Sequence, residues 1–215
     1  MPRSSQFELR RWIAATLLAE ALGFAAGMGL GRAMYFLVGG EPSGAAGVLF
    51  VVGLSTLAGV IEGACLGAGQ WRVLRGVVPG VGAGAWIAAS ATGGALAWIL
   101  GMSAGPHVPS PLPAPWIGAL VLVLSGLVLG AVLGGAQAVV LHRRSGPSGW
   151  WVSANAVGWM LGLLCVYAGM TLVPDGALTA SGLVILGLSG AAMAVSPALA
   201  TGLVLRAFSR ARRDP

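Results

Sequence analysis

The stretch GVIEGACLGAGQWRVLR, residues 59–75, predicts the fold class, because it is apolar, rich in glycine and ends in two arginines. Its first glycines, Gly59, Gly63 and Gly67, recur at every fourth residue and therefore lie along one face of a helix. Small residues at this spacing let membrane helices approach closely. The stretch thus indicates a membrane helix that packs through its glycine face and ends at a basic stop.

The rest of the chain has the same character. Of its 215 residues, 57% are hydrophobic and 8% are charged. A hydrocarbon core of ~30 Å needs about 20 apolar residues of helix. Long apolar runs without alternation do not fit barrel strands. The sequence predicts an all-α integral membrane protein with six transmembrane helices, near residues 12–38, 45–71, 82–103, 116–141, 150–173 and 178–207.

The arginines fall almost entirely on one side of this predicted membrane topology. Those in the N-terminus, the second and fourth loops and the C-terminus are Arg3, Arg10, Arg11, Arg72, Arg75, Arg143, Arg144, Arg206, Arg210, Arg212 and Arg213. An even number of spans brings these segments together, and the positive-inside rule makes their side cytoplasmic. Arg32, Glu41 and Asp175 fall on the opposite side. We therefore expect a protein of the cell (inner) membrane with both termini in the cytoplasm.

The net charge of +6 follows from this topology and predicts no nucleic-acid partner. Contact with anionic lipid headgroups accounts for the basic loops and for the basic tail, residues 209–215. The lipid bilayer is thus the expected partner. Glycine faces can pack within one chain or between chains, so a membrane-protein partner and a homo-oligomer both remain open.

An internal repeat runs through the chain. WIAAT, WIAAS and WVSAN, which begin at Trp12, Trp86 and Trp151, each open a helix that leaves the cytoplasmic side. The helices that return also align. Their matched positions are Gly59, Gly63, Gly67, Gln70 and Leu74, then Gly126, Gly130, Gly134, Gln137 and Leu141, then Gly190, Ala194, Ala198, Thr201 and Leu205. The predicted unit is a helical hairpin, repeated at about 10–76, 82–144 and 149–208.

A two-helix unit keeps its orientation when it is duplicated, so the copies should be related by an axis along the membrane normal. This predicts a fold with pseudo-threefold symmetry. Gln70 and Gln137 lie on the glycine face near the cytoplasmic end, where an amide typically bonds across a helix interface. Trp12, Trp86 and Trp151 are expected to be interfacial anchors.

Two acidic residues depart from the repeat. Glu20 has Gly94 and Trp159 as its counterparts, and Glu62 has Leu129 and Met193. From the positions of Trp12 and Arg72, both acids lie ~12 to 15 Å from the cytoplasmic edge, close to the middle of the bilayer. Two carboxylates at this depth can hardly both be ionised without a cation or a polar partner.

An ionisable residue inside the membrane suggests a functional site, because a charge there costs about 2.5 to 3.5 kcal/mol even on insertion scales. One interpretation is a protonation or cation site formed by Glu20 and Glu62 with Thr16, Ser55 and Asn155. The other is a neutral acid that hydrogen-bonds to a neighbouring carbonyl or to one of these polar side chains.

The remaining motifs indicate little chemistry. Cys65 and Cys165 are lone thiols, and the chain has no CxxC pair or Cys/His cluster, so no metal site is predicted. His107 and His142 lie in a loop and in a basic stop, away from mid-membrane, and no cofactor is expected. Pro197 removes a backbone donor, so the last helix is expected to bend. No catalytic motif is present, and we do not expect an enzyme.

The pattern GxxxQWxxLR followed by WWxxxxxxGW resembles a loose group of uncharacterised bacterial multi-pass proteins rich in glycine, tryptophan and Gln-Trp hairpin repeats. The residues that carry the resemblance are Gln70, Trp71, Arg75, Trp150, Trp151 and Trp159. The likeness as a whole covers most of the chain. The resemblance implies the membrane fold and brings no activity with it.

Two functions therefore remain open. The first, favoured by base rate, is a non-catalytic accessory or scaffold bundle whose glycines and tryptophans serve packing. The second, favoured by physical specificity, is a small permease or channel for a solute or ion, with or without coupling to protons, with Glu20 and Glu62 at its site. They differ in whether the two acids face a wet interior.

Overall fold

The computed structural model describes residues 7–40, 44–104, 114–144, 146–173 and 179–212. Within these ranges the protein is all-α, and its helices are long and apolar enough to cross a membrane. They are α1 (Leu9–Leu37), α2 (Gly44–Leu74), α3 (Ala83–Ala104), α4 (Pro115–His142), α5 (Ser148–Leu172) and α6 (Ala180–Ala211). The prediction of six membrane-spanning helices is therefore confirmed, with boundaries that differ by a few residues.

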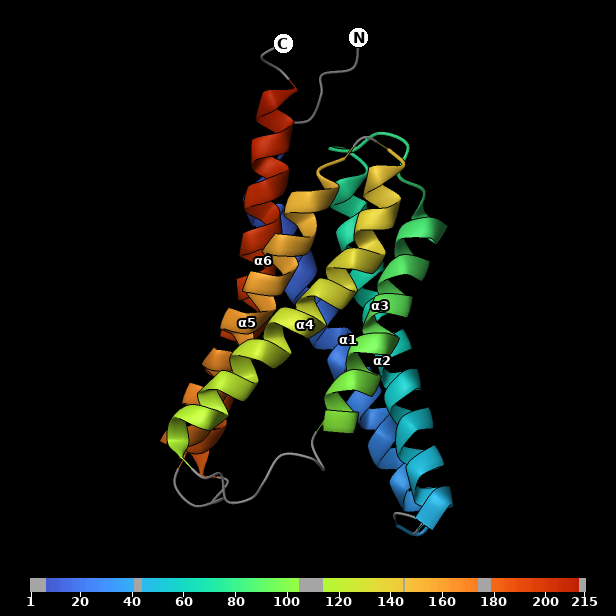
Figure 1. Ribbon diagram of the computed structural model, residues 1–215, viewed down its shortest axis with the longest axis vertical. Coiled ribbons are helices and arrows are strands. Elements are labelled where there is room, and N and C mark those ends of the chain that lie inside the picture. The colour runs from blue at the N-terminus through green and yellow to red at the C-terminus, as the bar shows by residue number, and fades with distance from the viewer. Residues whose placement is uncertain (1–6, 41–43, 105–113, 145, 174–178, 213–215) are drawn as a thin grey trace.

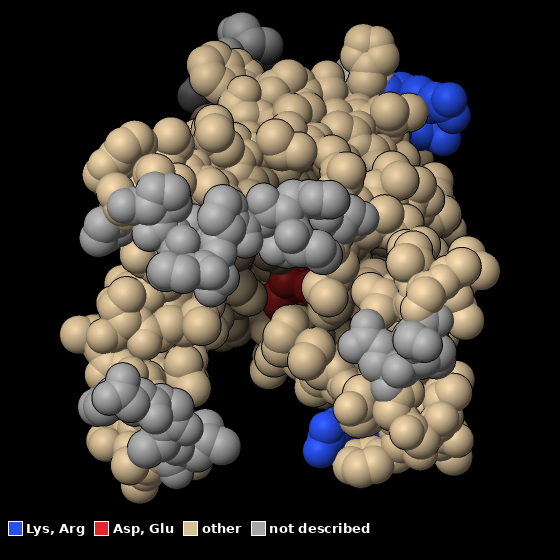
Figure 2. All heavy atoms as spheres, turned by 60° about the horizontal axis from the view of Figure 1, so that its bottom comes forward, with Lys and Arg blue, Asp and Glu red and all other residues tan. Residues whose placement is uncertain are grey.

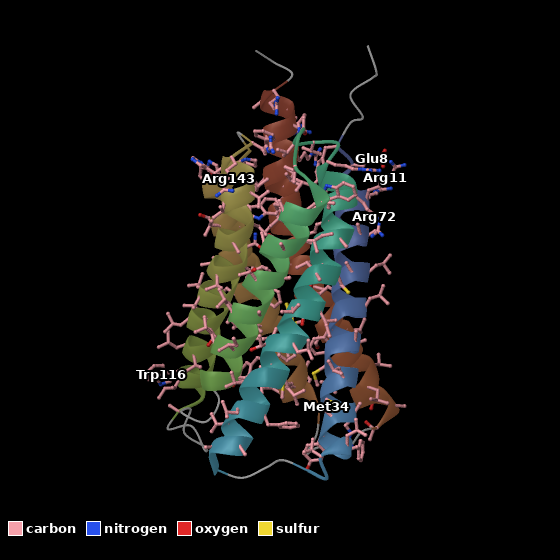
Figure 3. The ribbon with its side chains drawn as sticks, turned by 90° about the vertical axis from the view of Figure 1, so that its right-hand side faces the viewer. Glu8, Arg11, Met34, Arg72, Trp116 and Arg143 are labelled. Atoms are coloured by element: carbon pink, nitrogen blue, oxygen red, sulfur yellow. The ribbon has the colours of Figure 1, made fainter. Side chains whose placement is uncertain are left out.

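The helices form a closed ring, in which each packs against its neighbours along the chain and α6 returns to α1 (Figure 1). Both chain termini lie at one end of the bundle, which we call the termini end, and α1 meets α2 at the opposite, far end. Arg11, Arg72 and Arg143 lie at the termini end, whereas Met34 and Trp116 lie at the far end (Figure 3). Arg3, Glu41, His107, Asp175 and Arg213 lie outside the described residues.

Large apolar side chains cover the outside of the bundle. Leu18, Leu37, Leu49 and Leu188 expose 65 to 80% of their surface, as does Trp150 at 76%. A soluble protein would have to hide such residues, whereas hydrocarbon solvates them as well as a protein core does. The interior instead holds most of the glycine contacts and the buried polar side chains, such as Glu20, Gln70 and Gln137. This inverted pattern follows from the lipid environment that the sequence predicts.

Glycines allow the backbones of neighbouring helices to touch. A Cβ atom added to Gly59 of α2 would lie 2.7 Å from the Cα of Ala95 on α3. A second contact of this kind joins α4 to α5, where a Cβ on Gly130 would lie 2.7 Å from the Cα of Ala156. Real Cβ atoms do not approach this closely, so any larger residue would push the helices apart. The glycine faces therefore pack within the chain.

A cluster of three tryptophans fills the bundle near its termini end. Trp12, Trp86 and Trp151 are all 0% exposed. The ring of Trp151 contacts the other two edge to face, with centroids 5.7 Å from Trp12 and 5.6 Å from Trp86. The expectation that these residues are interfacial anchors was wrong, because their rings point into the bundle. Edge-to-face packing of three large rings closes its centre.

Leucines extend this cluster, and α6 passes beside it without a break. Leu74, Leu141 and Leu205 are also 0% exposed and belong to the same apolar cluster. Pro197 sits inside α6, which nevertheless remains helical from Ala180 to Ala211. The close approach of Gly158 on α5 leaves room for the proline ring, since a Cβ there would lie 3.0 Å from the Cβ of Pro197.

Candidate functional site: a carboxyl pair between two cavities

The two intramembrane acids meet inside the bundle. Glu20 on α1 is 5% exposed and Glu62 on α2 is 7% exposed. Their carboxyl groups lie close enough for their charges to interact. Gly23 makes this possible, because a Cβ at that position would lie 2.7 Å from the Cα of Glu62. The equal depth read from the sequence is therefore matched by helix rotations that turn both acids inward and toward each other.

A hydrogen bond between two carboxyl groups requires a proton on one of them, because a carboxylate has no donor. Two carboxylates in contact also repel each other strongly when water is excluded. Glu20 and Glu62 can therefore share one proton, as the carboxyl pairs of aspartic proteases do. In that state the pair carries one net negative charge. It can take up a second proton or a cation.

Trp98 on α3 fixes one side of the pair. Its indole Nε1 donates a hydrogen bond of 2.7 Å to Oε2 of Glu62. This bond holds the carboxyl group in place and leaves its charge facing the space beside the indole ring. Trp98 could not be found from the sequence, because an indole that follows Trp86 by a little over three turns carries no sign of its partner on another helix.

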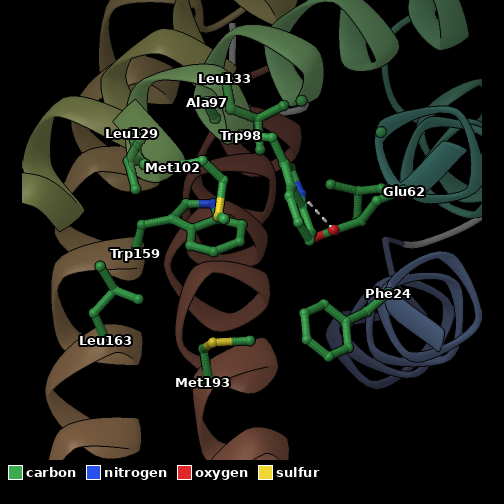
Figure 4. Close-up of a pocket in the computed structure, with 14 residues that line it drawn as sticks. Phe24, Glu62, Ala97, Trp98, Met102, Leu129, Leu133, Trp159, Leu163 and Met193 are labelled. Carbon is green, nitrogen blue, oxygen red and sulfur yellow. Dashed lines mark hydrogen bonds between the residues drawn. The ribbon is translucent and has the colours of Figure 1, made fainter. Parts of the chain in front are cut away.

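A cavity of about 220 Å³ lies on the far side of the pair, and we call it the far cavity. Glu62, Trp98, Phe24, Met102, Trp159 and Met193 contribute to its walls, which are otherwise apolar. Figure 4 shows the labelled side chains around this common space, with Trp98 bonded to Glu62. Seen from the far end, the bundle has a hollow with acidic atoms at its base (Figure 2). The pair thus lies at the floor of an opening toward the far end.

A second, much smaller cavity lies on the termini side of the pair, and we call it the central cavity. Its volume of about 10 Å³ leaves room for roughly one water molecule. Thr16, Glu20, Asn155 and Thr201 line it. The hydroxyl of Thr16 is fully buried and has no hydrogen-bond partner among the described residues. A buried hydroxyl without a partner indicates a place for a bound water or ion.

A polar network closes the central cavity toward the termini end. Nε2 of Gln137 donates to Oε1 of Gln70 at 3.0 Å and to Oγ of Ser90 at 2.8 Å, while its Oε1 accepts from Nε1 of Trp151 at 2.9 Å. One amide therefore joins four helices. Trp12 completes the layer by donating to Oγ1 of Thr201 at 3.1 Å. The tryptophan cluster and this network together seal the bundle.

Of the five predicted site residues, two form the acid pair, two lie beside it and one lies elsewhere. Thr16, Glu20 and Asn155 line the central cavity, and Glu62 lines the far cavity. Ser55 lies elsewhere, where its hydroxyl donates to the carbonyl of Val51 and it lines another cavity shared with Arg32. The prediction that Ser55 belongs to the site was wrong, since it lies two helical turns from Glu62 toward the far end.

Other residues of the site could have been found only in part. Thr201 and Ser90 stand at the repeat positions of Gln137 and Asn155, so the repeat itself marked them. Trp159 stands at the repeat position of Glu20 and lines both cavities. It forms a wall between them. Whether a side chain lies between two cavities depends on how each helix is rotated about its own axis. The sequence of one helix does not show this rotation.

The fold and the site define a class of protein: a six-helix membrane bundle with a buried carboxyl pair between two cavities. In the described ranges, no group of three or more His, Cys, Asp or Glu residues could hold a metal ion. No protein-family model, curated protein or solved structure matches the chain. Its function must therefore be inferred from the site.

Proposed function

We propose that the protein is a small permease of the cell membrane that binds a solute or ion at Glu20 and Glu62, with coupling to protons. The observation that carries this proposal is the position of the acid pair between a cavity open to the far end and a sealed termini end. Transporters characteristically bind their substrates near the bilayer midplane and expose the site to one side at a time.

The order of features along the bundle axis supports this proposal. A solute that enters from the far end reaches Glu62 at the floor of the far cavity. Beyond the pair lie the central cavity and then the buried rings of Trp12, Trp86 and Trp151. Passage to the termini end would require these rings to separate. A change of charge at the pair is the natural trigger, since a proton or a cation alters its electrostatic repulsion.

We also propose that three hairpins with pseudo-threefold symmetry provide the moving parts. Matched contacts between successive hairpins support this. Gly63 packs on the carbonyl of Ser90, and Gly130 packs on the carbonyl of Asn155, which is the repeat counterpart of Ser90. The contact between α6 and α1 is the sparsest of the ring, and a Cβ added to Gly190 of the third hairpin would meet no neighbour within 4 Å. This looser seam is where one hairpin could rock against the next.

The proposed orientation places the termini end in the cytoplasm. The described arginines of the loops and the C-terminal segment gather at that end, as Arg72 and Arg143 illustrate in Figure 3. They would contact the anionic lipid headgroups of the inner leaflet. With this orientation, the far cavity opens to the outside of the cell. The conformation described would then be the one that faces outward.

A scaffold role is the competing function, and the packing gives it less support. A scaffold needs a surface for its partner, and small-residue faces are the usual means for helices to associate in a membrane. Here the glycine faces of α2 and α4 are occupied by α3 and α5. They are not free for a second protein. A scaffold also gains nothing from two acids that meet at the floor of a cavity.

Alternating access can be tested without knowledge of the substrate. In a chain with Cys65→Ala and Cys165→Ala, Thr201→Cys places a thiol behind the tryptophan cluster, because Thr201 is 1% exposed and lines the central cavity. A membrane-impermeant, charged methanethiosulfonate is added to sealed vesicles whose termini end faces the reagent. Every thiol reacts faster as the pH rises, because the thiolate is the nucleophile, so each rate is divided by that of the exposed control Arg210→Cys at the same pH. We expect this relative rate to be low for Thr201→Cys and to change with pH. Adding Glu62→Gln should abolish that change.

Two further variants control this experiment. Arg210→Cys lies exposed at the termini end, so its reaction reports which vesicles present that end. Met102→Cys lies in the far cavity and should react only from the opposite side, with a pH dependence opposite to that of Thr201→Cys. If Thr201→Cys stays unreactive at every pH while Arg210→Cys reacts, the termini end never opens. That result would reject the permease and favour the scaffold.

A further inference from the structure

We propose that the far cavity binds a small apolar organic cation, such as a substituted ammonium, with its charge beside Glu62 and its apolar body against Phe24, Trp98 and Trp159. This inference rests on the proposed function and names the class of solute that the site takes. Three properties of the cavity carry it: its charge, the chemistry of its walls and its size.

The charge of the cavity selects a monovalent cation. Glu62 is the single ionisable side chain among the described residues of its wall. Glu20 stands behind it, and a pair that shares one proton has one negative charge. The side chains that face the cavity from α3, α4, α5 and α6 carry no ionisable group, and neither Cys65 nor Cys165 is among the residues that line it. One positive charge would neutralise the site, and an anion would be repelled.

The walls select an apolar body. Apart from Glu62, the polar side-chain groups on the wall are the indole N–H groups of Trp98 and Trp159, and that of Trp98 already donates to Glu62 at 2.7 Å. A sugar or another strongly hydrated solute would lose many hydrogen bonds with water and find few replacements. Phe24, Trp98 and Trp159 offer aromatic surface, which attracts organic ammonium groups through cation–π interactions. Met102 and Met193 add polarisable, adaptable surface.

The volume of the cavity limits the size of the cation that it can bind. Its volume of about 220 Å³ is just below the ~300 Å³ at which pockets for drug-sized ligands begin. A single aromatic ring with a substituted ammonium group is therefore a better match than a lipid or a large dye. A bare metal ion would fill little of this space, and it would lack oxygen ligands, since Glu62 supplies the only side-chain oxygens on the described walls.

The same pair makes cation and proton compete. A second proton on Glu20 or Glu62 removes the negative charge that attracts the cation, so binding should weaken as the pH falls. The unpartnered hydroxyl of Thr16 lies beside Glu20 in the central cavity, where one water fits. A water there would offer the proton a route on the side of the pair opposite to the cation. Cation and proton would thus meet the pair from different cavities.

The test uses two probes of nearly the same shape. Radiolabelled benzyltrimethylammonium is the cation, and neopentylbenzene, in which carbon replaces the nitrogen, is the neutral competitor. The full chain in lipid nanodiscs should retain the cation at neutral pH and lose it on acidification, while neopentylbenzene should fail to displace it. Glu62→Gln should weaken binding by about tenfold or more, because it removes a buried partner charge. Glu8→Gln, which alters an exposed glutamate at the termini end, should leave binding unchanged.

The other outcomes test the cation site and the permease separately. Equal binding of both probes, or full binding by Glu62→Gln, would mean that the cavity takes neutral apolar molecules. Absence of cation binding at every pH would mean that the class of ligand is wrong. Neither result depends on the accessibility of Thr201→Cys. Either one would therefore reject the organic cation as the ligand without rejecting the permease. If Thr201→Cys never reacts but the cation binds, the site is a receptor site in a static bundle.

Discussion

At the scale of single residues, three tryptophans at matched positions differ in one hydrogen bond. Nε1 of Trp12 donates to Thr201, and Nε1 of Trp151 donates to Gln137. Nε1 of Trp86 is buried and finds no partner among the described residues. Its matched acceptor would be Gln70, whose oxygen already accepts from Gln137. Nε1 of Trp86 is therefore a buried donor without a hydrogen-bond partner among the described residues.

This difference predicts unequal effects of three identical substitutions. Trp12→Phe and Trp151→Phe each remove ring volume and a buried hydrogen bond, and leave an acceptor without its donor. Trp86→Phe removes similar volume but also an unsatisfied donor, whose burial costs about 1 to 3 kcal/mol. We expect Trp86→Phe to lower the free energy of unfolding by about 1 kcal/mol less than the other two do. Reversible unfolding in mixed detergent micelles measures this difference.

The three variants control one another, because all three rings are 0% exposed and lie in one cluster. If Trp86→Phe proves as costly as Trp151→Phe, the Nε1 of Trp86 must have a partner, and a bound water would be the natural candidate. Equal and small costs for all three would mean that these hydrogen bonds contribute little beyond packing.

At the scale of helices, glycine decides how closely each pair can pack. The contact between α4 and α5 depends on Gly130, which lies against the backbone of Asn155 and Ala156. Gly135 is on the same helix, but a Cβ there would meet nothing within 4 Å. The two glycines therefore have the same helix propensity and opposite surroundings. One is needed for packing, and the other only weakens the helix.

Replacing each of these glycines by alanine should have effects of opposite sign. Gly130→Ala forces α4 and α5 apart and should destabilise the fold by about 1 to 3 kcal/mol, as overpacked cores do. Gly135→Ala should be neutral or stabilise by up to about 1 kcal/mol, because alanine favours helix. Thermal unfolding in one detergent compares the two variants directly. Similar melting temperatures would show that the close contact of α4 with α5 contributes little.

At the scale of the whole molecule, the helices form a closed ring, so the chain could begin with a different hairpin and still form the same contacts. Both termini lie at the same end as the connection between α4 and α5, which includes the exposed Arg143 and Arg144. The connection between α2 and α3 differs, because Val78 is 0% exposed and Trp71 donates to the carbonyl of Val81 at 3.0 Å. The first connection is exposed at its arginines, and the second is part of the core.

Two circular permutants test this distinction. A chain that begins at Gly146 and joins its old termini through a flexible Gly/Ser linker of about 20 residues should fold, because every hairpin keeps its orientation. A chain cut between Val78 and Gly80 should be much less stable, since the cut opens a buried segment. Yield of monodisperse protein and thermal unfolding compare them. Failure of both would mean that the hairpins do not assemble as exchangeable units.

Most of the fold could be predicted from the sequence, because it depends on local properties. Apolar runs of about 20 residues fixed the number of helices, and arginines at their ends indicated which loops share a side. The glycine spacing from Gly59 to Gly67 indicated a packing face. Glu20 and Glu62 were identified as candidates because a carboxyl group in hydrocarbon is costly wherever it points.

The partners of these residues could not be predicted in the same way. The rotation of each helix about its axis decides whether Glu20 meets Glu62, whether Ser55 joins them and whether the tryptophan rings face lipid or the core. A rotation of one residue, ~100°, would change all three outcomes without changing the composition of any helix. The sequence periodicity is weak here, because apolar side chains occur both on the lipid face and in the core.

The sequence by itself thus determined a six-helix membrane bundle with two acids at mid-depth. Hydrophobicity, charge and helix geometry act along the chain and need no neighbour. Only the tertiary structure decided that the acids pair, that Trp98 holds Glu62 and that a cavity opens toward the far end while three tryptophans close the bundle near its termini end. The reason is that hydrogen bonds and cavities belong to pairs of surfaces, which exist only once the helices are packed.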